Sequence, residues 1–159
     1  MDQLDSFDRA ILRIIQDDAA QSYAQLGEQV NLSASATLRR VQRMRENGTI
    51  IATRAIVDPE RVGHPLTILV EVTLENEHAA ALEGTKQALI DDPHVQQCYY
   101  VTGHADLFAV LAITSMPAYK AFTDRHFTGN ANIKKFKTSV VMDCVKTTTV
   151  FPVHGDGRT

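Results

Sequence analysis

The spacing of apolar residues changes along the chain, from a helical period in residues 4–46 to a strand period after residue 65. The first predicted helix carries Leu4, Phe7, Ile11, Leu12, Ile14 and Ile15, and it ends within residues 17–20. A second helix is predicted at 22–30, because a Ser-x-x-Gln capping box precedes its apolar positions. A third helix is predicted at 33–48, with a serine at its start and Asn-Gly at its end.

The third predicted helix separates apolar residues and arginines onto opposite faces. At about 100° of rotation per residue, the stripe that packs on neighbouring helices comprises Ala34, Leu38, Val41 and Met44. The opposite face comprises Ser35, Ala36, Arg39, Arg40 and Arg43. Between Ser33 and Arg54 there are five arginines, one glutamate and no lysine, although the whole chain has a formal net charge of -3. Positive charge is therefore concentrated on this helix.

Two closely spaced helices, of which the second is cationic, are typical of a helix-turn-helix that places its second helix in the DNA major groove. Arginine suits this role because its planar fork can bind two phosphate oxygens or the edge of a guanine. We therefore predict DNA contacts from Ser33, Ser35, Ala36, Arg39, Arg40, Arg43 and Arg54. The segment Thr49–Val57 is rich in Ile, Val and Thr, which predicts a short strand or wing. The alternative is a basic helix face that is merely solvated.

Turn-forming residues mark a linker in the middle of the chain, so the expected domains are 1–54 and 66–159, joined by a linker at 55–65. In order, the second domain is predicted to contain a strand at 66–74, a helix at 76–92, strands at 95–102 and 107–113, a helix from Ser115 through Phe127, a strand at 133–145 and a short strand at 149–153. This order is that of a ferredoxin-like βαββαβ domain.

The two helices of this domain cover one sheet face, and apolar residues on both strand faces predict that a second subunit covers the other. A two-fold dimer also suits a DNA site made of two half-sites.

Composition narrows the function classes. Hydrophobic residues make up 44% and charged residues 22% of the chain, as in a globular soluble protein. No apolar run approaches the about 18 residues of a membrane span, and the acidic N-terminus is unlike a secretory signal, so we expect a cytoplasmic protein. Cys98 and Cys144 lie far apart without a CxxC pair, which favours buried reduced thiols. The histidines lack zinc spacing, and no catalytic motif is recognisable, so we expect no metal, no cofactor and no catalytic residue.

Four separated segments carry a family resemblance. They are LDSFDRAILRIIQDDA from Leu4, LSASATLRRVQRMRENGTI from Leu32, VTGHAD at 101–106 and TSVVMDCVKTTTVFP at 138–152. In this order they resemble the Lrp/AsnC (leucine-responsive, feast/famine) family of transcription regulators over nearly the whole chain. The resemblance implies an α+β protein of two domains. Its N-terminal winged helix-turn-helix of three helices would bind double-stranded DNA. Its C-terminal ACT-like (RAM) domain would form dimers, build tetramers or octamers, and sense an amino acid or related small molecule.

The same resemblance implies where the effector binds. It points to the turn Thr102, Gly103, His104, Ala105 and Asp106, completed by Thr138, Ser139 and Val140 of a neighbouring subunit. The chemistry of the turn agrees, because Gly103 permits close backbone approach, exposed amides can hold an α-carboxylate, and Asp106 can pair with an α-ammonium. The alternative is a plain tight hairpin. The family turn is usually Gly-Asp-Tyr-Asp, so His104 and Ala105 leave the identity of the effector open, and Thr53 replaces a tyrosine that is frequent after the helix-turn-helix.

The working hypothesis has three links. Arginines of the third helix grip DNA, the second domain sets the distance between two recognition helices, and a bound amino acid changes the assembly and hence that distance. Two alternatives stay open on the sequence alone. Sirohaem decarboxylases resemble the same two-domain fold, although such an enzyme would be expected to lack the basic helix face. An amino-acid-binding assembly module that never touches DNA is the other, and salt-dependent DNA binding would exclude it.

Overall fold

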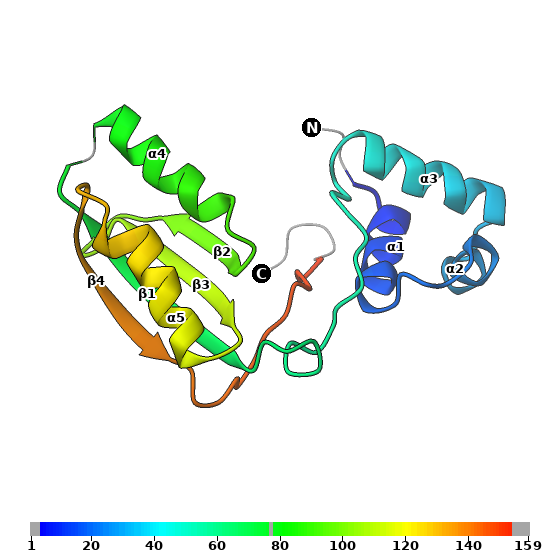
Figure 1. Ribbon diagram of the computed structural model, residues 1–159. Helices are drawn as coiled ribbons and strands as arrows, with labels where there is room; N and C mark the ends of the chain where they lie inside the picture. Colours follow the sequence, from blue (N-terminus) through cyan, green and yellow to red (C-terminus); the bar gives the residue numbers. More distant parts are fainter. Residues whose placement is uncertain (1–3, 77, 154–159) are drawn as a thin grey trace. The chain divides into compact units, whose positions relative to one another are not determined.

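Three helices of the first compact unit follow the predicted apolar pattern (Figure 1). The computed structural model describes residues 4–76 and 78–153. The helices are α1 (Ser6–Asp17), α2 (Tyr23–Val30) and α3 (Ala34–Glu46). A side chain caps the start of each one, with capping boxes at Asp5 and Ser22 and a single serine cap at Ser33. The predicted helices are therefore confirmed, and local capping explains where each begins.

The core of this unit is built from all three helices. Its buried apolar residues are Ile11, Leu12, Leu26, Val30, Val41 and Met44. The predicted α3 stripe is confirmed at its last two positions, whereas Ala34 is exposed and Leu38 is only half-buried. Thr37 is fully buried instead, and its hydroxyl donates to the Ser33 carbonyl oxygen at 3.0 Å. A polar threonine is tolerated in this core because its hydroxyl has a partner.

The segment that begins at Lys146 belongs to the helical unit and not to the sheet domain. By contacts, one unit consists of the chain through Ala55 together with this segment, and the other is Ile56–Val145. The Gln16 side chain makes two hydrogen bonds with the backbone of Phe151, of 3.0 and 2.8 Å, and Val153 packs against the helical core. The second compact unit therefore begins before residue 66 and ends before residue 159, the bounds of the expected domain.

Two short strands predicted from β-branched runs do not form. Residues 51–57 and 149–153 have no regular secondary structure and join no sheet in the described part of the chain. A strand needs a neighbour to satisfy its backbone N–H and C=O groups, and periodicity alone does not reveal whether one is present. For the same reason the last strand ends at Val140 and not at the predicted residue 145.

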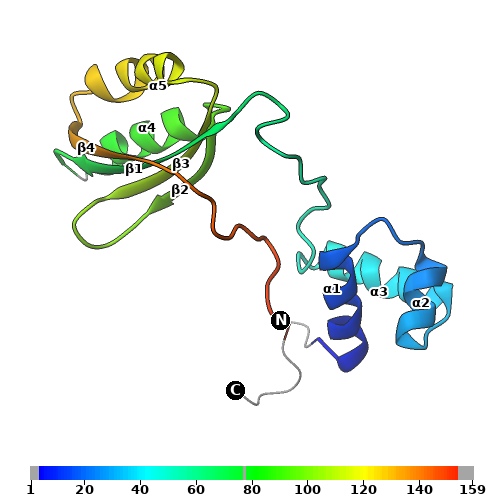
Figure 2. The same cartoon turned by 90° about the horizontal axis from the view of Figure 1, so that it is seen from below.

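The second unit contains a four-stranded antiparallel sheet of order β2-β3-β1-β4. Its elements are β1 (Leu66–Leu74), α4 (Ala79–Ile90), β2 (Val95–Tyr100), β3 (Leu107–Ile113), α5 (Met116–Thr123), the π-helical turn η1 (Asp124–Thr128) and β4 (Ile133–Val140). Figures 1 and 2 show α4 and α5 on the same face of the sheet. This arrangement confirms the predicted ferredoxin-like fold.

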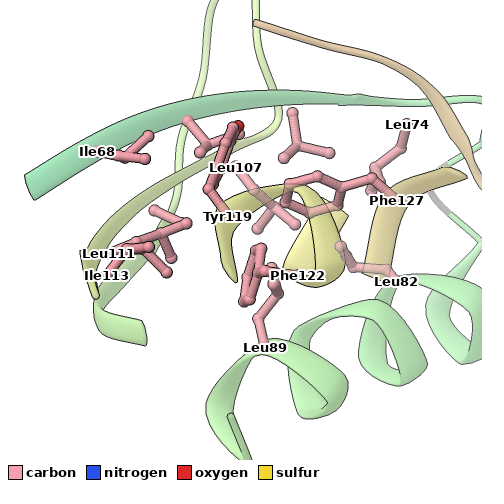
Figure 3. Close-up of a cluster of buried hydrophobic side chains, with 13 residues drawn as sticks. Ile68, Leu74, Leu82, Leu89, Leu107, Leu111, Ile113, Tyr119, Phe122 and Phe127 are labelled. Carbon is pink, nitrogen blue, oxygen red and sulfur yellow. The ribbon is translucent and has the colours of Figure 1, made fainter. Parts of the chain in front are cut away.

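The sheet has one packed face and one open face. Ile68, Val70 and Val72 of β1 are fully buried, whereas Leu69 between them is 40% exposed. Figure 3 shows the buried strand side chains beside Leu89 of α4 and Phe122 of α5. The alternation along the sequence therefore separates residues packed under the helices from residues that no described segment of the chain covers.

The two cysteines are not in a disulfide. Cys98 lies half-buried on β2, and burial raises the pKa of its thiol. Cys144 follows the end of β4 and is exposed, so the prediction that both thiols are buried is wrong at this position. The reason is that β4 ends before the cysteine is reached.

A buried carboxylate ties together the ends of α4 and α5. The side chain of Asp92 is only 3% exposed and lies 2.8 Å from His94 Nδ1, 2.7 Å from His126 Nε2 and 3.5 Å from Arg125 Nη1. Burial by itself raises the pKa of Asp92, but hydrogen bonds from the His94 amide and from the His126 and His94 imidazoles outweigh it and lower that pKa to about 2. The ionised carboxylate is therefore strongly favoured in the folded state.

Replacing Asp92 with Asn is expected to lower the free energy of unfolding by about 2 kcal/mol at pH 7, because the folded-state pKa lies so far below the ordinary value. A folded pKa below the unfolded one gives stability that is complete above about pH 4 and is lost as the pH falls toward 2. Urea unfolding at several pH values measures this. Asp124→Asn, which removes only an exposed pair with Lys120, should change stability by less than about 0.5 kcal/mol. A deficit of Asp92→Asn that did not shrink toward acid pH would contradict the assignment.

Candidate nucleic-acid interface and effector turn

The turn between α2 and α3 fixes the position of α3. Asn31 adopts a left-handed conformation with φ 56°, and the Leu32 amide donates to the Gly27 carbonyl oxygen at 2.9 Å. The Ser33 hydroxyl then accepts a hydrogen bond from the Ala36 amide at 3.2 Å. Gly27 lies so close to the turn that an added Cβ would be 2.5 Å from the Leu32 carbonyl oxygen. The helix-turn-helix therefore depends on a glycine at this crossing and on a cap at Ser33.

The exposed side of α3 and the adjoining turn enclose a shallow depression of about 330 Å³. It is lined by Leu32, Ala36, Arg39, Arg40 and Arg43. Ser35 is exposed beside it, and its hydroxyl lies 3.1 Å from that of Ser33. The structure thus brings together the predicted residues of α3. Arg54 is exposed but does not line the depression.

Of the three predicted arginines that lie on α3, two are held by acidic residues of α1. Arg40 Nη1 lies 2.7 Å from Asp5 Oδ2 and 2.9 Å from Asp8 Oδ1. Arg43 Nη2 lies 2.5 Å from Asp8 Oδ2. The hydrogen bond to Asp5 raises the pKa of Arg40, and the Asp8 amide lowers the pKa of Asp5. Both ions of the Arg40–Asp5 pair are therefore stabilised in their charged forms.

The acidic partners were not anticipated from the helical wheel of α3. A wheel shows only residues of one helix, whereas Asp5 and Asp8 lie more than 30 residues away in sequence, at the start of α1. A signal was present, because an Asp-x-x-Asp pair before an apolar run predicts a capping box, and the structure contains it. Arg39 differs from its neighbours, since it makes no ion pair or hydrogen bond with any residue that the structure describes.

The predicted effector turn joins β2 to β3. Gly103 has φ 129°, a conformation that favours glycine, and the Val101 amide donates to the Asp106 carbonyl oxygen at 2.9 Å. The Asp106 carboxylate accepts a hydrogen bond from the Leu74 amide at 2.7 Å. One oxygen of this carboxylate is therefore already used to hold the end of β1. Thr102, Gly103 and His104 are exposed, and Ala105 is buried.

Glu71 connects this turn to β4 across the open face of the sheet. Its Oε2 lies 2.8 Å from His104 Nε2 and 3.9 Å from Lys137 Nζ. Neither Glu71 nor Lys137 was among the predicted site residues. A signal existed, because Glu71 is the one charged residue of β1. A charge in an otherwise apolar strand usually needs a partner or a ligand.

The other predicted effector residues lie on β4. The Thr138 hydroxyl is hydrogen-bonded to the Tyr119 hydroxyl of α5, so its side chain faces the helices. Ser139 pairs with Leu69 and Val140 with Ile68 in the ladder with β1. Within one chain, Thr138 is thus directed away from the open face on which His104 meets Glu71.

Residues 4–76 and 78–153 contain neither a cluster of metal-ligating side chains nor a membrane-spanning helix. This part of the chain contains no cluster of three or more His, Cys, Asp or Glu side chains placed to hold a metal ion. None of its helices has the length and apolar character required to cross a bilayer.

The fold and the cationic face of α3 define a helix-turn-helix DNA-binding protein with an attached ferredoxin-like domain. The AsnC-type helix-turn-helix domain matches residues 4–45, and the Lrp/AsnC ligand binding domain matches residues 67–151. The chain belongs to the Lrp/AsnC family of transcriptional regulators. It is a regulator and not an enzyme, so the sirohaem decarboxylase alternative falls away.

Relatives and solved structures agree along nearly the whole chain. An uncharacterised HTH-type transcriptional regulator of Sinorhizobium fredii is 40% identical, over 96% of this chain and 90% of the relative. The Bkd operon transcriptional regulator of Pseudomonas aeruginosa is 32% identical, over 91% and 95%. A Neisseria meningitidis transcriptional regulator in complex with L-methionine has a TM-score of 0.89 at 27% identity, covering 94% and 97%. An AsnC family regulator of Agrobacterium tumefaciens has a TM-score of 0.88 at 30% identity, with the same coverage.

Proposed function

We propose that this regulator docks the exposed face of α3 in the major groove of double-stranded DNA. The observation that carries the proposal is the depression on α3, which is lined by Ala36, Arg39, Arg40 and Arg43. Ser35 and Ala36 are small enough for close approach, and Arg39 has its full donor set available. Ser33 contributes by capping α3, and Arg54 by contacting the DNA backbone. Binding of a duplex by an Arg39→Ala variant is the test, and a marked loss of affinity is expected.

The open face of the sheet is the proposed surface for self-assembly. It presents Leu69, which is 40% exposed, and Tyr99, which is 52% exposed, beside the half-buried Phe108 and Val110. Covering such a face removes apolar area from water, which favours association. A homodimer formed in this way, further assembled into a tetramer or octamer, would present two α3 helices to two half-sites.

We place the protein in the cytoplasm, because a regulator must reach the chromosome.

An amino acid is the proposed effector, and it needs no further cofactor. The exposed backbone at Gly103 offers a site for an α-carboxylate, and the Glu71 carboxylate with the His104 imidazole offers hydrogen-bonding partners for an α-ammonium or a polar side chain. The neighbouring subunit's Thr138, Ser139 and Val140 segment would complete the site. The structure of the Neisseria meningitidis regulator with L-methionine supports this class of ligand. Asp106 serves chiefly to hold the turn, because Leu74 already uses one of its oxygens.

Replacing Gly103 with Ala is expected to weaken effector binding about tenfold or more, because a side chain at φ 129° strains the turn and moves its amides. A thermal-shift screen of the common amino acids identifies the ligand, and calorimetry then measures the affinity of each variant. Gly129→Ala is the matched control, since its φ is -92° and an added Cβ meets only an ordinary contact at 3.9 Å. Equal effector affinity in Gly103→Ala and the wild type would place the ligand elsewhere.

A further inference from the structure

We propose that Asp8 is a positioning residue for DNA recognition, which withholds Arg40 and Arg43 from phosphate binding and leaves Arg39 as the free cation beside the depression. This inference rests on the proposed docking of α3 on DNA. It assigns different roles to three arginines that a helical wheel treats as equivalent.

Asp8 binds two arginines at once through its two carboxylate oxygens. Its side chain is fully buried, with Oδ1 bound to Arg40 and Oδ2 bound to Arg43. Oδ2 also accepts a hydrogen bond from the Asp5 amide at 3.1 Å, while the Asp8 amide donates to Asp5 Oδ1 at 2.9 Å. Both carboxylate oxygens are therefore occupied, and the capping box fixes the residue to the start of α1. A buried carboxylate in this position cannot follow an arginine that swings out toward a ligand.

Arg40 is restrained most strongly. It binds Asp5 and Asp8 and lies over the Phe7 ring at 5.3 Å, a distance at which a guanidinium is attracted to the aromatic face. Its side chain is 25% exposed, compared with 46% for Arg43, which has Asp8 alone. Arg43 is thus the arginine that loss of Asp8 would release.

Pairing Arg40 and Arg43 with aspartates affects specificity because it lowers the number of free cations on the DNA-facing surface. Non-specific binding depends on how many phosphates are neutralised by free cations, and each contact adds about 0.9 to the slope of log affinity against log salt concentration. Two arginines paired with two aspartates add little net charge to the DNA-facing surface. A surface with fewer free cations binds random DNA less strongly, so a larger share of its affinity depends on base contacts.

The test compares wild type and Asp8→Asn for binding to a duplex selected from a randomised pool and to a scrambled duplex, over a range of salt concentrations. Asparagine keeps the shape of the side chain but removes the charge that holds Arg43. The affinity for scrambled DNA is expected to rise roughly five- to tenfold at 0.1 M salt, with a slope steeper by about 0.9. The ratio of selected to scrambled affinity should fall. Circular dichroism verifies that the variant is folded, and Asp8→Asn combined with Arg43→Gln should lose the gain.

A second comparison applies even if Asp8→Asn does not fold. In the otherwise wild-type chain, Arg43→Gln is expected to reduce the salt slope on scrambled DNA by less than half as much as Arg39→Gln. Equal losses for the two variants would overturn the inference, and so would a folded Asp8→Asn whose slope is unchanged or shallower. Failure of the proposed docking is distinguishable, because Arg39→Gln would then leave DNA binding intact.

Discussion

Replacing Gly27 with Ala is expected to lower the free energy of unfolding of the helical unit by roughly 2–3 kcal/mol and to abolish DNA binding at 37 °C. The added Cβ would lie 2.5 Å from the Leu32 carbonyl oxygen and 3.0 Å from Thr37 Oγ1, so α2 and α3 would have to move apart. The same movement would break the hydrogen bond from the Leu32 amide to Gly27. Chemical unfolding followed by circular dichroism measures the loss.

Gly84→Ala provides the matched control for this substitution. Gly84 lies in the interior of α4, is exposed, and has open space where a Cβ would be added. Alanine there should stabilise the protein by about 0.5–1 kcal/mol, because glycine is a poor helix former. If the two variants changed stability in the same direction, close packing at the α2–α3 crossing would not be the cause.

Replacing Arg39 with Ala is expected to weaken binding to a selected duplex by about 10- to 100-fold, the usual cost of losing an arginine that contacts a base edge or phosphate. Arg39 lines the depression on α3 and has no protein partner among the described residues, so its donors are available to DNA. Fluorescence anisotropy with labelled duplex gives the dissociation constant, and light scattering shows whether the assembly is unchanged.

Arg45→Ala is the control of equal charge on the same helix. Arg45 is exposed but does not line the depression, so its removal should weaken binding by less than about threefold. Equal losses for Arg39→Ala and Arg45→Ala would mean that α3 attracts DNA only through its total charge.

The sequence was sufficient for the helices and for the four strands of the sheet because their signals are local. The caps at Ser22 and Ser33, the period of α3 and the alternation in β1 each depend on residues within one turn or one strand. The function was predictable from the family resemblance, since the helix-turn-helix and ligand-binding domains match most of the chain.

Local sequence patterns do not predict contacts between residues that are far apart in the sequence. The pairing of Asp8 with Arg43 joins two helices, and the meeting of His104 with Glu71 depends on the order of strands in the sheet. The β-branched run at residues 51–57 has the composition of a strand, but it joins no sheet in the described chain. Such runs specify a strand only when a neighbouring edge is available.

Hydrogen–deuterium exchange of the full-length protein, with and without a selected duplex, tests the central claim most directly. If α3 enters the major groove, backbone amides of residues 32–43 should exchange more slowly with DNA bound, and a scrambled duplex at the same salt concentration should protect them less. Protection confined to the sheet domain, with residues 32–43 unchanged, would contradict the claim that this helix docks on DNA.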